Sequence, residues 1–228
     1  MIYFRYKKCR DLSTNKEQRK EQPDFQLVKD KAASFCSLFP GLASEEEVID
    51  ILCILDTNTF QVLSPGSART LAGLYLRVSL LNHSCVTNCR LIFRSDSCLQ
   101  VRASLEIKRG QQVNISYTPP FFSLIARNNI LHRGKQFLCF CPRCEDPSEL
   151  GTNLSSVRCE AGDCEKLLGV FQHTGAFSED WECSQCKRRI NYQQYAALDA
   201  KYLGQSQHCY CYKPIRQQFQ FAISANNF

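Results

Sequence analysis

Long hydrophobic runs are missing from this 228-residue sequence, in which no stretch of about 18 apolar residues occurs. We therefore expect no transmembrane helix and no membrane partner. Residues 1–8 also lack the apolar core of a secretory signal peptide, because Arg5, Lys7 and Lys8 interrupt them. With 44% hydrophobic and 22% charged residues, the composition is that of a soluble globular protein. These features predict an intracellular location, in the nucleus, the cytoplasm or both.

Cysteine, by contrast, is abundant, with 15 residues. Because a reducing compartment disfavours disulfides, closely spaced cysteines there indicate metal binding. One group consists of Cys139, Cys141 and Cys144. It supplies three thiolates, one fewer than a closed structural zinc site needs. The alternative interpretation is that these are buried free cysteines. A second group has two pairs with 18 residues between them, which is typical of a zinc ribbon. Its members are Cys159, Cys164, Cys183 and Cys186.

Zinc binding changes how the charge is interpreted. The formal net charge of +6 counts every cysteine as neutral. Two zinc ions held by eight thiolates lower it to about +2. The net charge therefore does not predict nucleic-acid binding. The basic run at 187–189 fits a contact with phosphate or an acidic partner, but a solvated surface is the simpler interpretation. His173 is interpreted as a loop residue and not as a metal ligand.

Two helices are predicted before the middle of the chain. Residues 24–38 show helical spacing of apolar residues. Ser44 and Glu47 form a capping-box pattern, which begins a second helix that should end near Asp56. Packing of an apolar face against the core is the simple interpretation of both helices.

The middle of the chain is predicted to contain short strands separated by turn signals, which indicates an α+β fold with mostly short strands. The clearest alternation of apolar and polar residues covers 99–107. A further helix is expected over 121–133, with Gly134 as its C-cap. Residues from 198 onward show no usable periodicity. The predicted strands are 58–63, 90–94, 99–107 and 113–117, with turns at 64–67 and 95–97.

Three segments together resemble a known family. Residues 82–89, with the order Asn-His-Ser-Cys-Val-Thr-Asn-Cys, resemble the N-H-S-C-x-P-N signature of SET-domain protein lysine methyltransferases. Residues 114–117 resemble the family's catalytic tyrosine strand, and residues 139–144 resemble its post-SET zinc cluster. The three occur in the family's order within residues 44–145. The resemblance implies a SET-type β-fold, in which the tyrosine strand threads past the N-H-S-C segment, followed by a zinc-ribbon-like module.

The resemblance is to the SMYD type (SET with a MYND finger), and especially to SMYD-like (SmydA-type) proteins of arthropods. It implies an S-adenosylmethionine-dependent protein-lysine N-methyltransferase, whose partner is a histone or another protein substrate. Such a methyl transfer needs orientation and a dry channel. The implied roles are cofactor binding for Asn82, His83, Phe137 and Asn58, catalysis for Tyr117, lining of the substrate channel for Phe60 and Lys135, and zinc binding for Cys85 with Cys139, Cys141 and Cys144.

Several of these residues also have a plain structural interpretation. Asn82 and His83 fit a turn with a polar pair, while Tyr117 and Phe60 fit the core of a sheet. The family usually has an aromatic residue at position 135, and Lys135 there is a cation that disfavours entry of a substrate ammonium. Thr87 replaces the usual proline.

Two family features are not found in residues 1–45, namely a G-x-G-type loop and the cysteines of a MYND finger. We therefore expect the chain to begin inside the family's domain. The competing hypothesis is an inactive SET remnant that serves as a zinc-stabilised interaction module. The expected organisation is a helical leader (1–43), the C-terminal half of a SET domain (44–134), a post-SET zinc region (135–150), a second zinc module with four cysteines (151–197) and an irregular tail (198–228).

Overall fold

The computed structural model describes residues 7–63, 70–94, 98–162, 164, 166–172 and 180–203. Its helices are α2 (Lys16–Lys20), α3 (Phe25–Leu38), α4 (Glu45–Asn58), the short 3-10 helix η1 (Val78–Leu80), α5 (Leu124–Lys135), α6 (Pro142–Glu145) and α7 (Tyr192–Leu203). Its strands are β1 (Thr59–Leu63), β2 (Thr70–Leu74), β3 (Asn82–His83), β4 (Cys89–Phe93), β5 (Leu99–Ala103), β6 (Asn114–Ile115), β7 (Val157–Arg158), β8 (Leu167–Gln172), β9 (Asp180–Cys183) and β10 (Arg189–Ile190). Within these ranges, no helix is long and apolar enough to cross a membrane.

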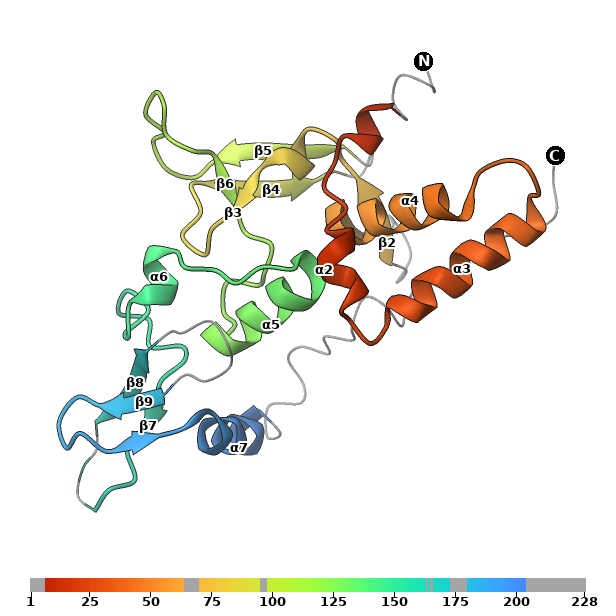
Figure 1. The fold of residues 1–228 in the computed structure, drawn as a ribbon. Helices are drawn as coiled ribbons and strands as arrows, with labels where there is room; N and C mark the ends of the chain where they lie inside the picture. The colour runs from red at the N-terminus through yellow and green to blue at the C-terminus, as the bar shows by residue number, and fades with distance from the viewer. Residues whose placement is uncertain are drawn as a thin grey trace.

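Helices α3 and α4 form a hairpin on one side of the molecule (Figure 1). The capping box predicted for α4 is confirmed, since Ser44 Oγ accepts from the Glu47 amide and Glu47 Oε2 accepts from the Ser44 amide. The helix continues to Asn58, two residues beyond the predicted end. Thr57 and Asn58 are buried, which explains why the last turn persists past the charged Asp56.

Three small two-stranded sheets follow, and they confirm an α+β fold built from short strands. Strands β1 and β2 pair antiparallel, as do β4 and β5. The strand predicted over 99–107 ends at Ala103, and Leu105 is largely exposed. The amides of Ser104 and Leu105 instead donate to the carbonyl of Asn88, which bends the chain away from the sheet. The predicted turns at 64–67 and 95–97 lie outside the described residues.

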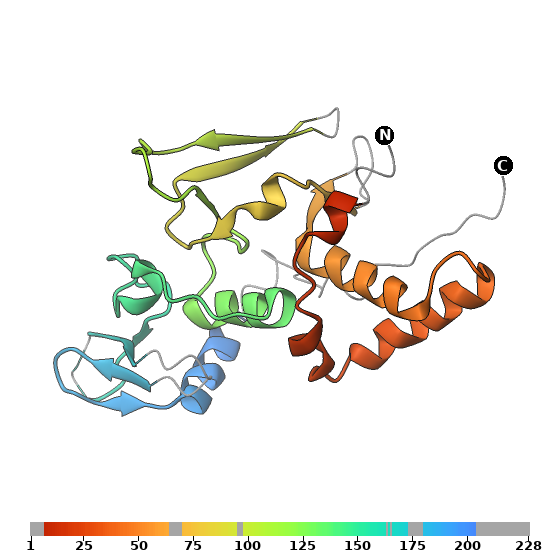
Figure 2. The same ribbon diagram turned by 45° about the horizontal axis from the view of Figure 1, so that its top comes forward.

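The third pair joins segments that are distant in sequence. Strand β3 runs parallel to β6, with Asn82 opposite Asn114 and His83 opposite Ile115. The Ser84 amide then donates to the Ile115 carbonyl at 3.1 Å. Figure 2 shows the two strands side by side below the β4–β5 hairpin. The tyrosine strand therefore passes directly beside the N-H-S-C segment.

Helix α5 lies between the small sheets and the C-terminal module (Figure 2). Its N-cap is Ser123, whose hydroxyl accepts from the Ala126 amide. The prediction of Gly134 as C-cap was wrong, because the helix runs to Lys135 and Gln136 adopts the left-handed conformation at φ 61°. The helix extends past Gly134 because its last residues are held by contacts with the N-terminal segment, described below.

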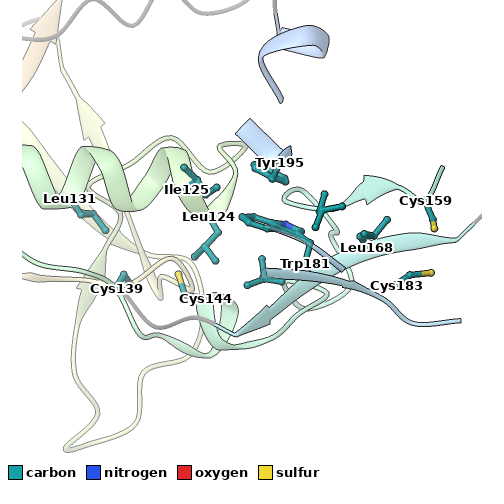
Figure 3. Packing of buried hydrophobic residues seen from close by; sticks show 12 residues of the cluster. Leu124, Ile125, Leu131, Cys139, Cys144, Cys159, Leu168, Trp181, Cys183 and Tyr195 are labelled. Carbon is teal, nitrogen blue, oxygen red and sulfur yellow. The ribbon is translucent and has the colours of Figure 1, made fainter. Parts of the chain in front are cut away.

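The C-terminal module is a four-stranded sheet in the order β10-β9-β8-β7, with α7 against it. Trp181 on β9 is fully buried and stacks on Tyr195 of α7 with ring centroids 3.9 Å apart. Figure 3 shows this pair at the centre of a core that also contains Leu124 and Ile125 of α5. The prediction of an irregular tail from residue 198 was wrong for residues 198–203, which continue α7. Packing of Tyr195 on the sheet stabilises a helix that has little periodicity of its own.

Candidate functional site

The first candidate zinc site is assembled from distant parts of the chain. Cys85 follows β3, whereas Cys139, Cys141 and Cys144 lie on the loop after α5 and on α6. Their sulfurs all lie within 4.8 Å of one another, with Cys85 Sγ 3.9 Å from Cys139 and 3.6 Å from Cys144. A tetrahedral zinc ion with Zn–S bonds of about 2.3 Å requires sulfurs about 3.8 Å apart. The four sulfurs therefore fit zinc and are too far apart for disulfides, which need about 2 Å.

The second group has the same geometry. Cys159 Sγ lies 3.5 Å from Cys186, and Cys164 Sγ lies 3.6 Å from Cys183. All four sulfurs are again within 4.8 Å of one another. Two cysteine groups able to hold zinc are thus present, as the cysteine spacing and, for Cys85, the family motif predicted. His173 lies outside the described residues.

A buried ion network, which no sequence pattern indicated, supports the first zinc site. Arg127 on α5 is fully buried and donates to Glu149 Oε1 at 2.6 Å and to Cys144 Sγ at 3.5 Å. Arg143 lies 3.3 Å from the same Glu149 oxygen. A site of four thiolates and one zinc ion carries a net negative charge, so a buried guanidinium beside a ligand sulfur stabilises it. In sequence these residues look like ordinary surface charges, and no spacing signal marks them.

His83 connects the zinc site to the tyrosine strand. Its Nδ1 accepts a hydrogen bond of 2.9 Å from the Tyr117 amide, and its Nε2 lies 3.3 Å from Cys85 Sγ. Because Nδ1 is the acceptor, the neutral ring carries its proton on Nε2, where it donates to the sulfur. His83 thus orients a zinc ligand and the backbone of Tyr117 at once.

The Tyr117 side chain is held beside the His83 ring. Its hydroxyl donates to the Leu81 carbonyl, just before the N-H-S-C segment. Burial raises the pKa of this hydroxyl, so it stays protonated at neutral pH. The ring lies 5.3 Å from the His83 ring and 6.5 Å from the Phe137 ring, measured between centroids. The structure therefore brings together three residues that the family motifs assigned to the cofactor and catalytic site.

Exposed and unsatisfied groups surround this aromatic cluster. Asn82 is exposed, and its side-chain amide makes no hydrogen bond to any residue in the described ranges. Phe137 is 36% exposed. Beside Asn82 in the sheet, the Oδ1 atom of Asn114 is buried without a hydrogen-bond partner in the described part of the chain. A buried acceptor without a partner is costly, so this spot favours an added polar group.

Two other predicted site residues face inward. Asn58 is buried, and its amide nitrogen donates to the carbonyls of Ser13 and Ile54, both at 2.8 Å. Phe60 packs in a hydrophobic cluster around Ile115, with its ring 6.1 Å from that of Tyr75. Both side chains therefore have structural contacts beneath the site.

Lys135 reaches the site from the end of α5. Its Nζ lies 5.2 Å from the centroid of the Tyr117 ring and donates to the Thr57 carbonyl. Burial, with the positive charge of Arg19 nearby, lowers the pKa of this amine to about 8. The residue expected beside the substrate channel thus contacts the tyrosine.

The basic run at 187–189 has local partners. Lys187 Nζ lies 3.3 Å from Glu182, and Arg189 donates to the same carboxylate at 2.8 Å. Ion pairs within one hairpin reduce the positive charge offered to a phosphate. This arrangement favours the solvated-surface interpretation.

These groups fit S-adenosylmethionine by their chemistry. The ligand has a flat aromatic base and a zwitterionic amino-acid end. A partly exposed phenyl ring suits the base, and an exposed amide that both donates and accepts suits the zwitterion. Phe137 and Asn82 supply these groups, and the Tyr117 ring contacts that of Phe137.

Comparison with known proteins agrees with this geometry. The family model described as "SET domain" matches residues 2–118. SET domain-containing protein SmydA-8, isoform A, of Drosophila melanogaster is 32% identical over 144 residues, which is 62% of this chain and 31% of the fly protein. Histone-lysine N-methyltransferase SMYD3 of Mus musculus is 29% identical over 119 residues, covering 52% of this chain and 27% of the mouse protein.

SET domain and MYND-type zinc finger protein 6 of Schizosaccharomyces pombe is 30% identical over 133 residues, covering 55% of this chain and 27% of the yeast protein. The chain thus spans about a third or less of the curated relatives it matches. The family-model match begins at residue 2 and so includes the helices before Ser44. Because that match covers half of the chain and the relatives are SMYD-type proteins, the chain belongs to the SET-domain family.

Proposed function

We propose that this chain is a protein-lysine N-methyltransferase that uses S-adenosylmethionine. The observation that carries the proposal is the grouping of the His83, Tyr117 and Phe137 rings, with the exposed Asn82 next to His83 in the chain, beside a cysteine cluster able to hold zinc. Relatives named histone-lysine N-methyltransferase support the reaction class. The substrate class is a lysine side chain of a histone or another protein.

When bound, S-adenosylmethionine supplies an electrophilic methyl group. The chain supplies position and exclusion of water. Asn82 and Phe137 would hold the ligand's polar and aromatic ends. The Tyr117 hydroxyl, protonated because of burial, is oriented by the Leu81 carbonyl and accepts contacts from polarised C–H groups and the incoming amine.

Zinc has a structural part in this proposal. A zinc ion on Cys85, Cys139, Cys141 and Cys144 would join the N-H-S-C segment to the loop that bears Phe137. Binding of the metal would then be folding energy for the cofactor pocket. A second ion would hold the C-terminal module. The reaction and both metal sites fit a nuclear or cytoplasmic location.

An inactive, zinc-stabilised interaction module is the second candidate, and Lys135 is the observation that favours it. Its amine lies over Tyr117, where it restricts approach of another ammonium. The two candidates differ in one experiment. The zinc-loaded chain is incubated with methyl-tritiated S-adenosylmethionine and mixed core histones.

Methyltransferase function predicts label on histone lysines, abolished by Asn82→Ala. Cofactor binding without label on histones or on any other offered protein favours the interaction module. Absence of cofactor binding contradicts the enzyme proposal.

A further inference from the structure

The Lys135 amine lies against the tyrosine of the proposed site. Its Nζ lies over the Tyr117 ring, 5.2 Å from the centroid, and is bonded to the Thr57 carbonyl. The geometry points to Lys135 as an internal methyl acceptor, a lysine of this chain that the SET site methylates in cis. This inference rests on the proposed methyltransferase function and adds a modification site to it.

The amine is held at this place by its surroundings. Asn15 donates from Nδ2 to the Lys135 carbonyl at 2.9 Å. Arg19 is 2% exposed and donates to the Gly134 carbonyl at 2.9 Å and to Thr57 Oγ1 at 3.0 Å. The end of α5 is therefore fixed on both sides, and the Lys135 side chain leads from a rigid point toward the tyrosine. A fixed acceptor raises its effective concentration at the reacting centre.

Burial is the main cause that lowers the pKa of this amine, and the positive charge of Arg19 adds to it. The Asp56 carboxylate, paired with Arg19 at 3.3 Å, acts in the opposite direction. Tyr117 faces the amine with its ring and stays neutral. Because burial outweighs the carboxylate, the pKa of Lys135 falls to about 8, and a useful fraction of the amine is neutral near that pH. An ordinary surface lysine is almost wholly protonated there.

The step is balanced without a further reactant. The lone pair on neutral Nζ of Lys135 forms a bond to the methyl carbon of the sulfonium donor, while the carbon–sulfur bond breaks and its electron pair stays on sulfur. The products are S-adenosylhomocysteine and a methylammonium, which loses its extra proton to water. Lys135 is then a substrate of the site and not merely an unreactive cation that competes with incoming lysines.

The test uses the full zinc-loaded chain, S-adenosylmethionine with a deuterated methyl group, and peptide mass spectrometry. We expect deuterated methyl on Lys135 at a rate independent of protein concentration, loss of that label in Lys135→Arg, and strong reduction in Tyr117→Phe. Lys20→Arg is the matched control, because Lys20 is exposed and paired with Glu17. It should leave the label unchanged.

A second readout needs no methyl transfer. Acetic anhydride labels free amines, and bound S-adenosylhomocysteine should protect Lys135 from it by at least about threefold while Lys20 is unaffected. Cofactor binding and histone methylation with an unmodified and unprotected Lys135 would overturn this inference and leave the proposed function standing. Failure of cofactor binding, measured by calorimetry on the same sample, overturns both.

Discussion

The backbone amide of Tyr117 donates a hydrogen bond of 2.9 Å to Nδ1 of His83, 34 residues earlier in the chain. This bond adds a side-chain contact to the parallel backbone pairing of β3 and β6. Through Nε2 the same ring reaches Cys85. A cysteine of the proposed zinc site and the proposed catalytic tyrosine are therefore joined by one imidazole, so removal of the metal is expected to disturb the proposed reaction site.

Two substitutions of His83 test its hydrogen bonds to the Tyr117 amide and to Cys85. His83→Asn keeps a side-chain oxygen that can accept from the Tyr117 amide, whereas His83→Phe keeps a ring and loses both bonds. We expect His83→Phe to lower the unfolding free energy by about 1–3 kcal/mol, because a partly buried amide loses its acceptor, and His83→Asn to lower it less. Denaturant unfolding measures this. Equal stability of both variants and the wild type would show that the bond does not hold the strand.

Removal of the Tyr117 hydroxyl should affect rate more than binding. Tyr117→Phe loses the bond to the Leu81 carbonyl but keeps the ring and its contacts with His83 and Phe137. We expect methyl transfer to fall about 10²-fold, since the reacting groups lose their alignment, with cofactor affinity within about twofold. Single-turnover kinetics and calorimetry give the two numbers. A matching loss of affinity would mean that Tyr117 binds the cofactor and does not orient the reaction.

The zinc content can be counted by atomic emission. We expect two zinc ions per chain, one in Cys85→Ser and one in Cys186→Ser, because each substitution opens one cysteine group. Cys98→Ser is the control and should keep two ions, since Cys98 is exposed and belongs to neither group. One ion in the unsubstituted chain would show that the second cysteine group holds no metal.

The chain should be strongly destabilised when one partner of the Arg127–Glu149 pair is removed. Arg127→Leu leaves a buried carboxylate facing Arg143 alone and should lower the unfolding free energy by about 3–5 kcal/mol. Because the guanidinium also contacts Cys144, zinc affinity should fall as well. The double variant Arg127→Leu/Glu149→Leu should recover part of the stability and none of the zinc affinity. Full recovery of zinc affinity would show that Arg127 acts only through Glu149.

Stability should depend on pH through Lys135. Its pKa is lowered to about 8 in the folded chain, so the cost of burying the ammonium is complete below pH 8 and disappears as the pH rises toward the unfolded value. Lys135→Met removes this cost. We expect the stability advantage of the variant to shrink by about 2 kcal/mol between about pH 7 and about pH 9.5. An advantage that stays constant over this range would place the amine in solvent.

Local signals in the sequence predicted local structure well. The capping box of Ser44 and Glu47 correctly located the start of α4 because both partners lie within four residues. The two cysteine groups could also be predicted, since cysteine pairs at fixed spacing indicate metal binding in many different folds. The family motif added Cys85 to the first group. The end of α5 could not be predicted from the sequence. Tertiary contacts of Asn15 and Arg19 hold the last residues of the helix, so it continues past Gly134.

Side-chain direction was the harder part of the site. A motif names Asn58 without showing that its amide faces the carbonyls of Ser13 and Ile54. Nor does spacing show that Arg127, in a helix with polar neighbours, is fully buried beside a zinc ligand. Such facts depend on which distant segment packs against the residue, and no local pattern contains that information.

Calorimetric titration of the zinc-loaded chain with S-adenosylmethionine tests the proposed cofactor site most directly. We expect saturable binding of about one ligand per chain, weakened at least about tenfold by Phe137→Ala and by Asn82→Ala, because stacking and amide contacts each contribute about 1–3 kcal/mol. No detectable heat of binding at millimolar ligand, in a chain shown to hold both zinc ions, would contradict it.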